Sequence, residues 1–275
     1  MRRLQDRVAV VTGAASGIGR ATAVLLAQRG CDLALVDIDE AGMKQTAESI
    51  EAVGRRVTQH VADVADIERM RELPDEIVSL HQHVHILMNN AGVAVGDTFE
   101  DHRLEDFERI VGINFWGVVY GCKFFLPYLK QQEEAHIVNL SSLFGLMGIP
   151  GQSSYCATKF AVRGLSEALL VELADTSVGV TSVHPGGIQT NIARSARSTM
   201  GDEMRQSAQQ LFDRIGMPPE RAAAKIVRAI ERGKHRCIIS RETYLADWLK
   251  RISPAGTQRL FAWAYRRRSA REATR

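Results

Sequence analysis

The sequence predicts an α/β protein, a single domain built on a doubly wound parallel sheet of the Rossmann type. Three observations predict it. Short apolar runs alternate along the chain with amphipathic segments of helical length, an order typical of βαβ units. Several of these runs are apolar almost throughout, as in strands that helices cover on both faces. The 275 residues contain no repeat, low-complexity block or linker, so one domain accounts for 1–275.

The first half of the chain supplies four strands. The run RVAVVT at 7–12 is short and rich in β-branched residues, which favours a strand. A glycine-rich turn and an apolar-periodic helix follow, and Gly30 is a natural residue to end that helix. The next expected elements are a strand at 31–37, a helix at about 40–53 that Gly54 stops, a strand at 55–61, a helix at about 66–80 and a strand at 84–90.

The second half continues the alternation with longer helices. The next expected elements are a helix at about 104–130 with a bend before Pro127, a strand at 136–142, a helix at about 153–174, a strand at 178–184, a helix at about 219–232 and a strand at 235–240. The stretch 191–217 is the least regular and is rich in Ser, Gln, Arg and Met. Its position suits a substrate lid.

The C-terminal extension, 241–275, mixes aromatic, aliphatic and cationic residues and predicts an amphipathic helix broken at Pro254. It could cover the active site, pack on another subunit or rest on a membrane surface. The last ten residues contain five arginines and one glutamate, a net +4, so the rest of the chain carries about −1. A solvated chain end and contact with an anionic partner or membrane are the two interpretations of this charge.

Composition narrows the functional classes. A net charge of +3 gives no reason to expect nucleic-acid binding. The four cysteines lie far apart and form no CxxC pair, which favours free thiols in a reducing compartment, and we expect a cytoplasmic protein. The N-terminus has no signal-peptide pattern, and we expect no apolar stretch near the roughly 18–20 residues that a membrane span needs.

A glycine-rich turn, TGAASGIG, follows the first strand and opens the first helix, with Gly13, Gly17 and Gly19 in it. Glycine permits the tight turn and a close approach of the backbone to a pyrophosphate, while the helix N-terminus presents free amides to the anion. Ser16 and Ile18 lie inside the turn and would add contacts. A glycine cluster in this strand–turn–helix setting predicts a dinucleotide site.

Asp37 ends the second strand, 18 residues after Gly19. A carboxylate there can accept both hydroxyls of the adenosine ribose and would repel a 2′-phosphate. Ser16 and Ile38 stand where a compensating cation would be needed. We therefore predict NAD as the cofactor in preference to NADP.

Three further motifs stand out: NNAG at 89–92, NLSS at 139–142, and Tyr155 followed four residues later by Lys159. With TGAASGIG they resemble the short-chain dehydrogenase/reductase family, over about 6–190 and in the family's order. The resemblance implies that 6–190 form the cofactor-binding and catalytic core. It also implies hydride transfer between a nicotinamide cofactor and an alcohol or ketone, and a homodimer or homotetramer with the helices of Asn114 and Tyr155 at the main interface.

The spacing of Tyr155 and Lys159 puts both on one face of a helix. A phenol with a pKa of about 10 is a poor base at neutral pH. A neighbouring ammonium and the positive nicotinamide would favour the phenolate and lower that pKa. Tyr155 would then act as the acid/base group, and Lys159 would also hold the nicotinamide ribose.

The resemblance assigns further roles. The family serine falls on Ser142 rather than Ser141 and would orient the substrate oxygen, and the assisting asparagine falls on Asn114, in a proton relay through water to Lys159. Gly187 departs from the family pattern, because many members have a larger residue there. The remaining implied cofactor contacts are Asp63, Val64, Asn90, Ala91, Gly92, Pro185, Gly186, Ile188 and Thr190.

Some conspicuous residues are given ordinary interpretations. His81, His83 and His85 alternate in HQHVH, but no cysteine or carboxylate partner is evident, so we expect solvated histidines and no metal site. Cys156 is interpreted as a small buried hydrophobe. No GxSxG motif surrounds Ser142, which excludes a hydrolase nucleophile.

The substrate is predicted only as a class. Apolar residues after Ser142 and after NNAG either line the substrate pocket, which would favour a lipophilic alcohol or ketone, or pack against the sheet or a partner. A 3-oxoacyl-thioester reductase is the alternative enzyme, and a non-catalytic cofactor-binding regulator or scaffold is the alternative of another class. The apolar residues concerned are Val93, Val95, Leu143, Leu146, Met147 and Ile149.

Overall fold

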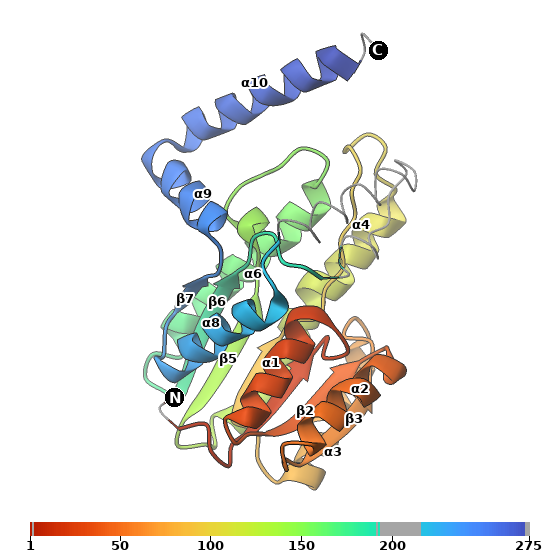
Figure 1. The fold of residues 1–275 in the computed structure, drawn as a ribbon, viewed down its shortest axis with the longest axis vertical. Helices are drawn as coiled ribbons and strands as arrows, with labels where there is room; N and C mark the ends of the chain where they lie inside the picture. Colours follow the sequence, from red (N-terminus) through yellow and green to blue (C-terminus); the bar gives the residue numbers. More distant parts are fainter. Residues whose placement is uncertain (2, 191, 193–215, 273–275) are drawn as a thin grey trace.

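The computed structural model describes residues 1, 3–190, 192 and 216–272, with the backbone alone for 268–272. Within these residues a parallel seven-stranded sheet has the order β3-β2-β1-β4-β5-β6-β7 (Figure 1). The predicted fold class is therefore confirmed. The predicted lid at 191–217 lies almost wholly outside the described residues. The strands are β1 (Val8–Thr12), β2 (Asp32–Asp37), β3 (Val57–Val61), β4 (Ile86–Asn89), β5 (Ala135–Leu140), β6 (Val178–His184) and β7 (Arg236–Ile238).

Helices cover both faces of the sheet and bury two separate apolar cores. One face packs against α1, α2 and α8, and the other against α3, α5 and α6. β1 pairs in parallel with β2 on one side and β4 on the other, so the order in which strands are added to the sheet reverses between β1 and β4. Open α/β sheets bind ligands in the crevice at the carboxyl ends of the strands at such a point. The α-helices are α1 (Gly17–Gln28), α2 (Glu40–Glu51), α3 (Ile67–His81), α4 (Leu104–Val111), α5 (Gly117–Leu129), α6 (Ser153–Glu172), α8 (Pro219–Glu231), α9 (Arg241–Ile252) and α10 (Pro254–Glu272).

The long helix predicted at 104–130 is divided. A π-helical turn, η1 (Gly112–Trp116), separates α4 from α5, while Pro127 lies within α5. The irregularity therefore comes well before the predicted bend. Such turns insert one extra residue into a helix and often accompany functional sites. Here the turn contains Asn114, which is fully buried.

The stretch Leu104–Leu129 is long and apolar enough to cross a membrane by length and composition. The expectation that no stretch approaches this length was therefore wrong. Burial accounts for part of this apolar character, because 39% of its most apolar window is buried and Val118, Cys122 and Phe125 of α5 pack into the core against the sheet. A helix between a sheet and a neighbouring helix needs apolar residues around much of its circumference.

The histidines of HQHVH differ from the prediction as well. His83 is exposed, but His81 and His85 are buried. His85 accepts a hydrogen bond from the amide of Val8 at 3.1 Å, and His81 contacts the Thr58 hydroxyl at 2.8 Å. Burial lowers the pKa of each to about 4, so both are neutral structural groups.

The C-terminal extension forms α9 and α10, which join at the predicted Pro254. The outer face of α9 is apolar and exposed, with Trp248 and Ile252 at 59% and 63%. Figure 1 shows α10 extending away from the body of the protein, and of its described side chains only Thr257 is buried. A membrane role for this extension stays a prediction.

Candidate active site

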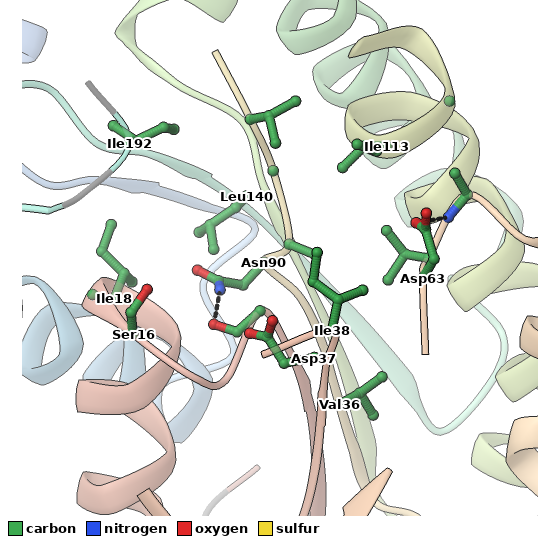
Figure 2. Close-up of a pocket in the computed structure, with 18 of the residues that line it drawn as sticks. Ser16, Ile18, Val36, Asp37, Ile38, Asp63, Asn90, Ile113, Leu140 and Ile192 are labelled. Carbon is green, nitrogen blue, oxygen red and sulfur yellow. Dashed lines mark hydrogen bonds between the residues drawn. The ribbon is translucent and has the colours of Figure 1, made fainter. Parts of the chain in front are cut away.

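A cavity of about 610 Å³ lies at the carboxyl ends of β1, β2, β4 and β5. Figure 2 shows the residues of its wall around Asp37 and Asn90. Five predicted site residues are not part of this wall: Gly19, Asn114, Ser142, Gly186 and Ile188. The predicted residues that line it are Gly13, Ser16, Gly17, Ile18, Asp37, Asp63, Val64, Asn90, Ala91, Gly92, Tyr155, Lys159, Pro185 and Thr190.

The glycine-rich turn requires its glycines for geometric reasons. Gly13 and Gly17 have φ of +66° and +53°, a region that side chains with a Cβ rarely enter. A Cβ at Gly19 would lie 2.0 Å from the carbonyl oxygen of Gly13. Ser16, at the N-cap of α1, makes no side-chain capping bond, so the first amides of the helix stay available to an anion.

Asp37 is fixed by the backbone around it. Its Oδ2 accepts from the amide of Ala15 at 2.9 Å, and its Oδ1 accepts from the amide of Asp39 at 3.1 Å. The carboxylate is therefore held at the cavity edge, where its remaining lone pairs can accept ribose hydroxyls. The glycine-rich turn, the free amides at the start of α1 and the Asp37 carboxylate together fit a nicotinamide dinucleotide.

The side chain of Asn90 lines the cavity, but its amide nitrogen is bonded to the backbone at the end of β1 and so joins the ends of β1 and β4. Its Nδ2 donates to the carbonyls of Thr12 and Gly13 at 2.9 and 3.0 Å, one of which is drawn in Figure 2. The Thr12 hydroxyl accepts in return from the amides of Asn90 and Ala91. The side chain of Asp63 is also bonded to the backbone, because its Oδ1 accepts from the Ala65 amide at 2.9 Å.

Tyr155 and Lys159 project from α6 toward the ends of β4 and β5. Lys159 is buried, and its Nζ donates to the carbonyl of Leu140 at 2.9 Å and lies 5.6 Å from the centre of the Tyr155 ring. Burial lowers the pKa of Lys159 to about 8. Burial also raises the pKa of the Tyr155 phenol to about 12, although a hydrogen bond with the Ser142 side chain opposes this shift.

Lys159 is not among the causes of this shift, and the lowering of the Tyr155 pKa by the ammonium together with the nicotinamide stays a prediction. Removing the phenol from water disfavours the charged phenolate, and this effect exceeds the stabilisation that nearby groups provide.

The two serines of NLSS have different environments. Ser141 donates its hydroxyl to the carbonyl of Lys159 at 2.7 Å, which ties β5 to α6. The Ser142 hydroxyl accepts from the amide of Phe144 at 3.1 Å and bonds to Tyr155. Ser142 is thus the serine beside the phenol.

Asn114 directs its side-chain amide mainly at Val93, and its Nδ2 also donates to the Thr158 hydroxyl at 3.5 Å. Its Oδ1 accepts from the amide of Val93 at 2.8 Å, and its Nδ2 donates to the carbonyl of Val93 at 2.9 Å. A Cβ at Gly92 would lie 3.2 Å from Asn114 Oδ1 and 3.5 Å from Lys159 Nζ, so these three residues are packed together. The predicted relay through Asn114 stays a prediction.

The stretch from Pro185 to Thr190 passes beside the glycine-rich turn. A Cβ at Gly17 would lie 3.0 Å from the Thr190 methyl group. Ile188 is buried and pairs with Met217 in a β-bridge. Of this stretch, Pro185 and Thr190 reach the cavity wall.

The predicted apolar substrate wall is reached only in part. Val93 lines the cavity, whereas Val95, Leu146 and Met147 are buried in the protein and do not line it. One helix face of α4 and η1 also lines the cavity and was not predicted from the sequence. It consists of Glu108, Arg109, Gly112 and Ile113. Their helical spacing, just before Asn114, was the available signal.

Comparisons with known proteins identify the family. The family model described as short chain dehydrogenase matches residues 7–201. The chain belongs to the short-chain dehydrogenase/reductase family. It is 42% identical over 265 residues to SadH, described as an oxidoreductase of Mycobacterium tuberculosis, across 95% of this chain and 96% of that protein. A 3-oxoacyl-acyl-carrier-protein reductase of Thermotoga maritima is 34% identical over 188 residues, 68% of this chain and 76% of that protein.

Solved structures agree. A short-chain dehydrogenase/reductase from Burkholderia phymatum in complex with NAD matches with a TM-score of 0.86 and 30% identity, over 91% of this chain and 95% of that one. One from Mycobacterium paratuberculosis bound to NAD matches with a TM-score of 0.76 and 27% identity, over 86% and 97%. The protein is an oxidoreductase of this family, acting on CH–OH groups of small molecules with a nicotinamide cofactor.

Proposed function

We propose that the protein transfers a hydride between NAD(H) and a lipophilic secondary alcohol or ketone, with Tyr155 as the acid/base group. The observation that carries this proposal is the convergence of Tyr155, Lys159 and Ser142 beside a cavity with a dinucleotide-type glycine turn. A binding module or scaffold would not need a buried lysine next to a buried phenol, because burial of an ammonium is unfavourable.

Each side chain has a distinct part in the proton transfer. The bound nicotinamide supplies or accepts the hydride and, when oxidised, carries a positive charge. Tyr155 gives its proton to the forming alkoxide in reduction and takes it back in oxidation. The Ser142 hydroxyl, already bonded to Tyr155, orients the substrate oxygen and stabilises its developing charge. Lys159 adds positive charge beside the phenol, and Leu140 fixes its position.

The proposal of NAD rests on Asp37. The amides of Ala15 and Asp39 hold its carboxylate in place, so it cannot easily turn away from a 2′-phosphate. Two NAD complexes among the similar structures support the same choice. Val93 and Leu140 on the wall support an apolar substrate.

Replacement of Tyr155 by Phe tests the mechanism. We expect Tyr155→Phe to lower kcat by about 10²–10⁴, the usual contribution of a general acid/base, because only the hydroxyl is removed. NADH binding, measured by fluorescence titration, should change little. The matched control is Tyr244→Phe, since Tyr244 is an exposed tyrosine on α9. Equal turnover of the Tyr155→Phe variant and the wild type would refute the mechanism.

A 3-oxoacyl-thioester reductase is a second candidate, favoured by the similarity to the Thermotoga maritima protein. A panel of short alkanols, hydroxysteroids and acyl thioesters, each with NAD(H) and NADP(H), separates the two. Turnover of bulky apolar alcohols with NAD supports the first candidate. Turnover confined to the thioester with NADPH supports the second.

We further propose a cytoplasmic homodimer or homotetramer formed through α5 and α6. Trp116, at the end of η1 just before α5, and Phe160 and Val171 on α6 are exposed, and the Trp116 ring stacks on Tyr120 of α5 at 5.7 Å between ring centres. Exposed aromatic side chains of this kind are enriched in subunit interfaces. Light scattering coupled to size-exclusion chromatography measures the mass directly, and a monomer would contradict this proposal.

A further inference from the structure

The first turn of α9 holds the glycine pair that follows β6. The amide of Gly187 donates to Glu242 Oε1 at 3.1 Å. A Cβ at Gly186 would lie 2.3 Å from Glu242 Oε1 and 2.3 Å from Ser240 Oγ. Ser240 is buried and shares a 2.9 Å hydrogen bond with the hydroxyl of Thr243. Polar side chains at the start of α9 therefore converge on Gly186, which only glycine can occupy.

The same glycine pair is fixed from the catalytic side. The carbonyl of Pro185 accepts from the amide of Leu143 at 2.7 Å, and the His184 ring contacts the carbonyl of Ser142 at 3.2 Å. The carbonyl of Gly187 accepts from the amide of Met217 at 2.9 Å. The stretch is thus clamped between the loop after Ser142 and the start of α9, and it continues to the cavity at Thr190.

We propose that Glu242 is a positioning residue for the nicotinamide half of the cofactor site. Its carboxylate holds the Gly187 amide and thereby sets the path of the backbone from Pro185 to Thr190. This inference rests on the proposed function, because it assumes that this stretch contacts the nicotinamide. Glu242 is not on the cavity wall, so it acts through the backbone rather than on the reacting atoms.

The local charges support this arrangement. Glu242 lies in the first turn of α9, where the helix dipole favours an anion. Burial raises the pKa of Glu242, but hydrogen bonds with the Ser240 side chain and the Gly187 amide outweigh it, so that the pKa lies below its ordinary value. A hydrogen bond to an ionised acceptor is stronger than a neutral one. The contact also connects the C-terminal extension, which α9 begins, to the active site.

The test compares two ligands that differ in the nicotinamide alone. ADP-ribose contains the adenosine and pyrophosphate of NADH but no nicotinamide. We expect Glu242→Ala to weaken NADH binding about tenfold, the effect of losing one charge-assisted hydrogen bond, and to change ADP-ribose binding less than twofold. Glu242→Gln keeps an acceptor oxygen and should restore most of the NADH affinity. Calorimetry measures both ligands on the full chain.

Asp247→Asn is the matched control. Asp247 is a carboxylate on the same helix that pairs with Arg236 at 2.7 Å and Arg251 at 3.2 Å, away from the glycine pair. This variant should lower the Tm and leave the ratio of NADH to ADP-ribose affinity unchanged.

Three outcomes would overturn the proposal: equal weakening of both ligands in Glu242→Ala, no weakening of either, or a selective loss of NADH affinity in Asp247→Asn. Failure of the proposed function is distinguishable, because wild-type protein would then show no NAD-dependent turnover before any variant is made.

Discussion

The two halves of the cavity are built by different means. At the ends of β1 and β2 the wall consists of backbone and of a carboxylate that the amides of Ala15 and Asp39 hold in place. At the ends of β4 and β5 it depends on buried side chains, chiefly Asn114 and Lys159. The first half fits its ligand through the shape of its backbone, and its polar side-chain atoms are hydrogen-bonded to neighbouring backbone groups. The second half holds the Lys159 ammonium in a buried position, where the charged form is disfavoured. The group needed for the reaction therefore lowers the stability of the folded protein.

The largest expected effect is the loss of cofactor binding when the close packing inside the glycine-rich turn is disrupted. In Gly19→Ala, the new methyl would lie 2.0 Å from the Gly13 carbonyl oxygen, which is backbone and cannot move without opening the turn. We expect NADH affinity to fall more than 100-fold, a loss of about 3 kcal/mol or more, in a fluorescence titration. Gly164→Ala in α6 is the control, because a Cβ there meets nothing within 4 Å.

If Gly19→Ala binds NADH as tightly as the wild type, the turn does not need close packing. The half of the cavity at β1 and β2 would then not depend on the shape of its backbone, and the contrast with the half at β4 and β5 would be wrong. Circular dichroism of both variants separates a loss of binding from a loss of fold.

The second prediction concerns the buried ammonium. Burial lowers the pKa of Lys159 from 10.5 to about 8. Below pH 8 both folded and unfolded chains hold the proton, and the wild type bears the full unfavourable energy of burial. Between pH 8 and 10.5 the unfolded chain binds a proton that the folded chain does not, so the stability that Lys159 confers rises with pH.

Lys159→Met removes this titration. The free energy of unfolding of the variant minus that of the wild type should therefore decrease by about 3 kcal/mol between about pH 7 and pH 10.5, at about 1.4 kcal/mol per pKa unit. Urea unfolding at several pH values measures it. Exposed Lys123→Met on α5 is the control and should show no such trend. Parallel pH profiles for wild type and Lys159→Met would show that burial of Lys159 does not oppose stability.

The same division decides what could be predicted from the sequence. The backbone wall has local signals, since the glycine spacing after β1 and Asp37 at the end of β2 encode its geometry directly, and the structure places these residues around one cavity. The catalytic half depends on how far each group is buried, which a motif does not show. Thus the YxxxK spacing gave the shared face of Tyr155 and Lys159 but not the burial that raises the pKa of the Tyr155 phenol.

Contacts between residues far apart along the chain could not be predicted from the sequence either. Nothing near Gly186 or Gly187 in the sequence indicates Glu242, which is 55 residues away along the chain from Gly187. The π-helical turn around Asn114 has no recognisable pattern in the sequence either, and its contact with Val93 joins residues 21 positions apart. These features exist only once β4, β6 and α9 are assembled.

The smallest expected effect returns to the backbone wall. Asp37→Asn leaves one carbonyl oxygen able to accept from the Ala15 or Asp39 amide, so the turn keeps most of its support, but it removes the negative charge that repels a 2′-phosphate. We expect the ratio of NADPH to NADH affinity to rise about tenfold, or about 1.4 kcal/mol, in parallel titrations. Asp39→Asn is the matched control, because Asp39 caps α2 through the Gly42 amide and does not line the cavity. An unchanged ratio would mean that Asp37 does not face the ribose, and that shape alone governs this half of the site.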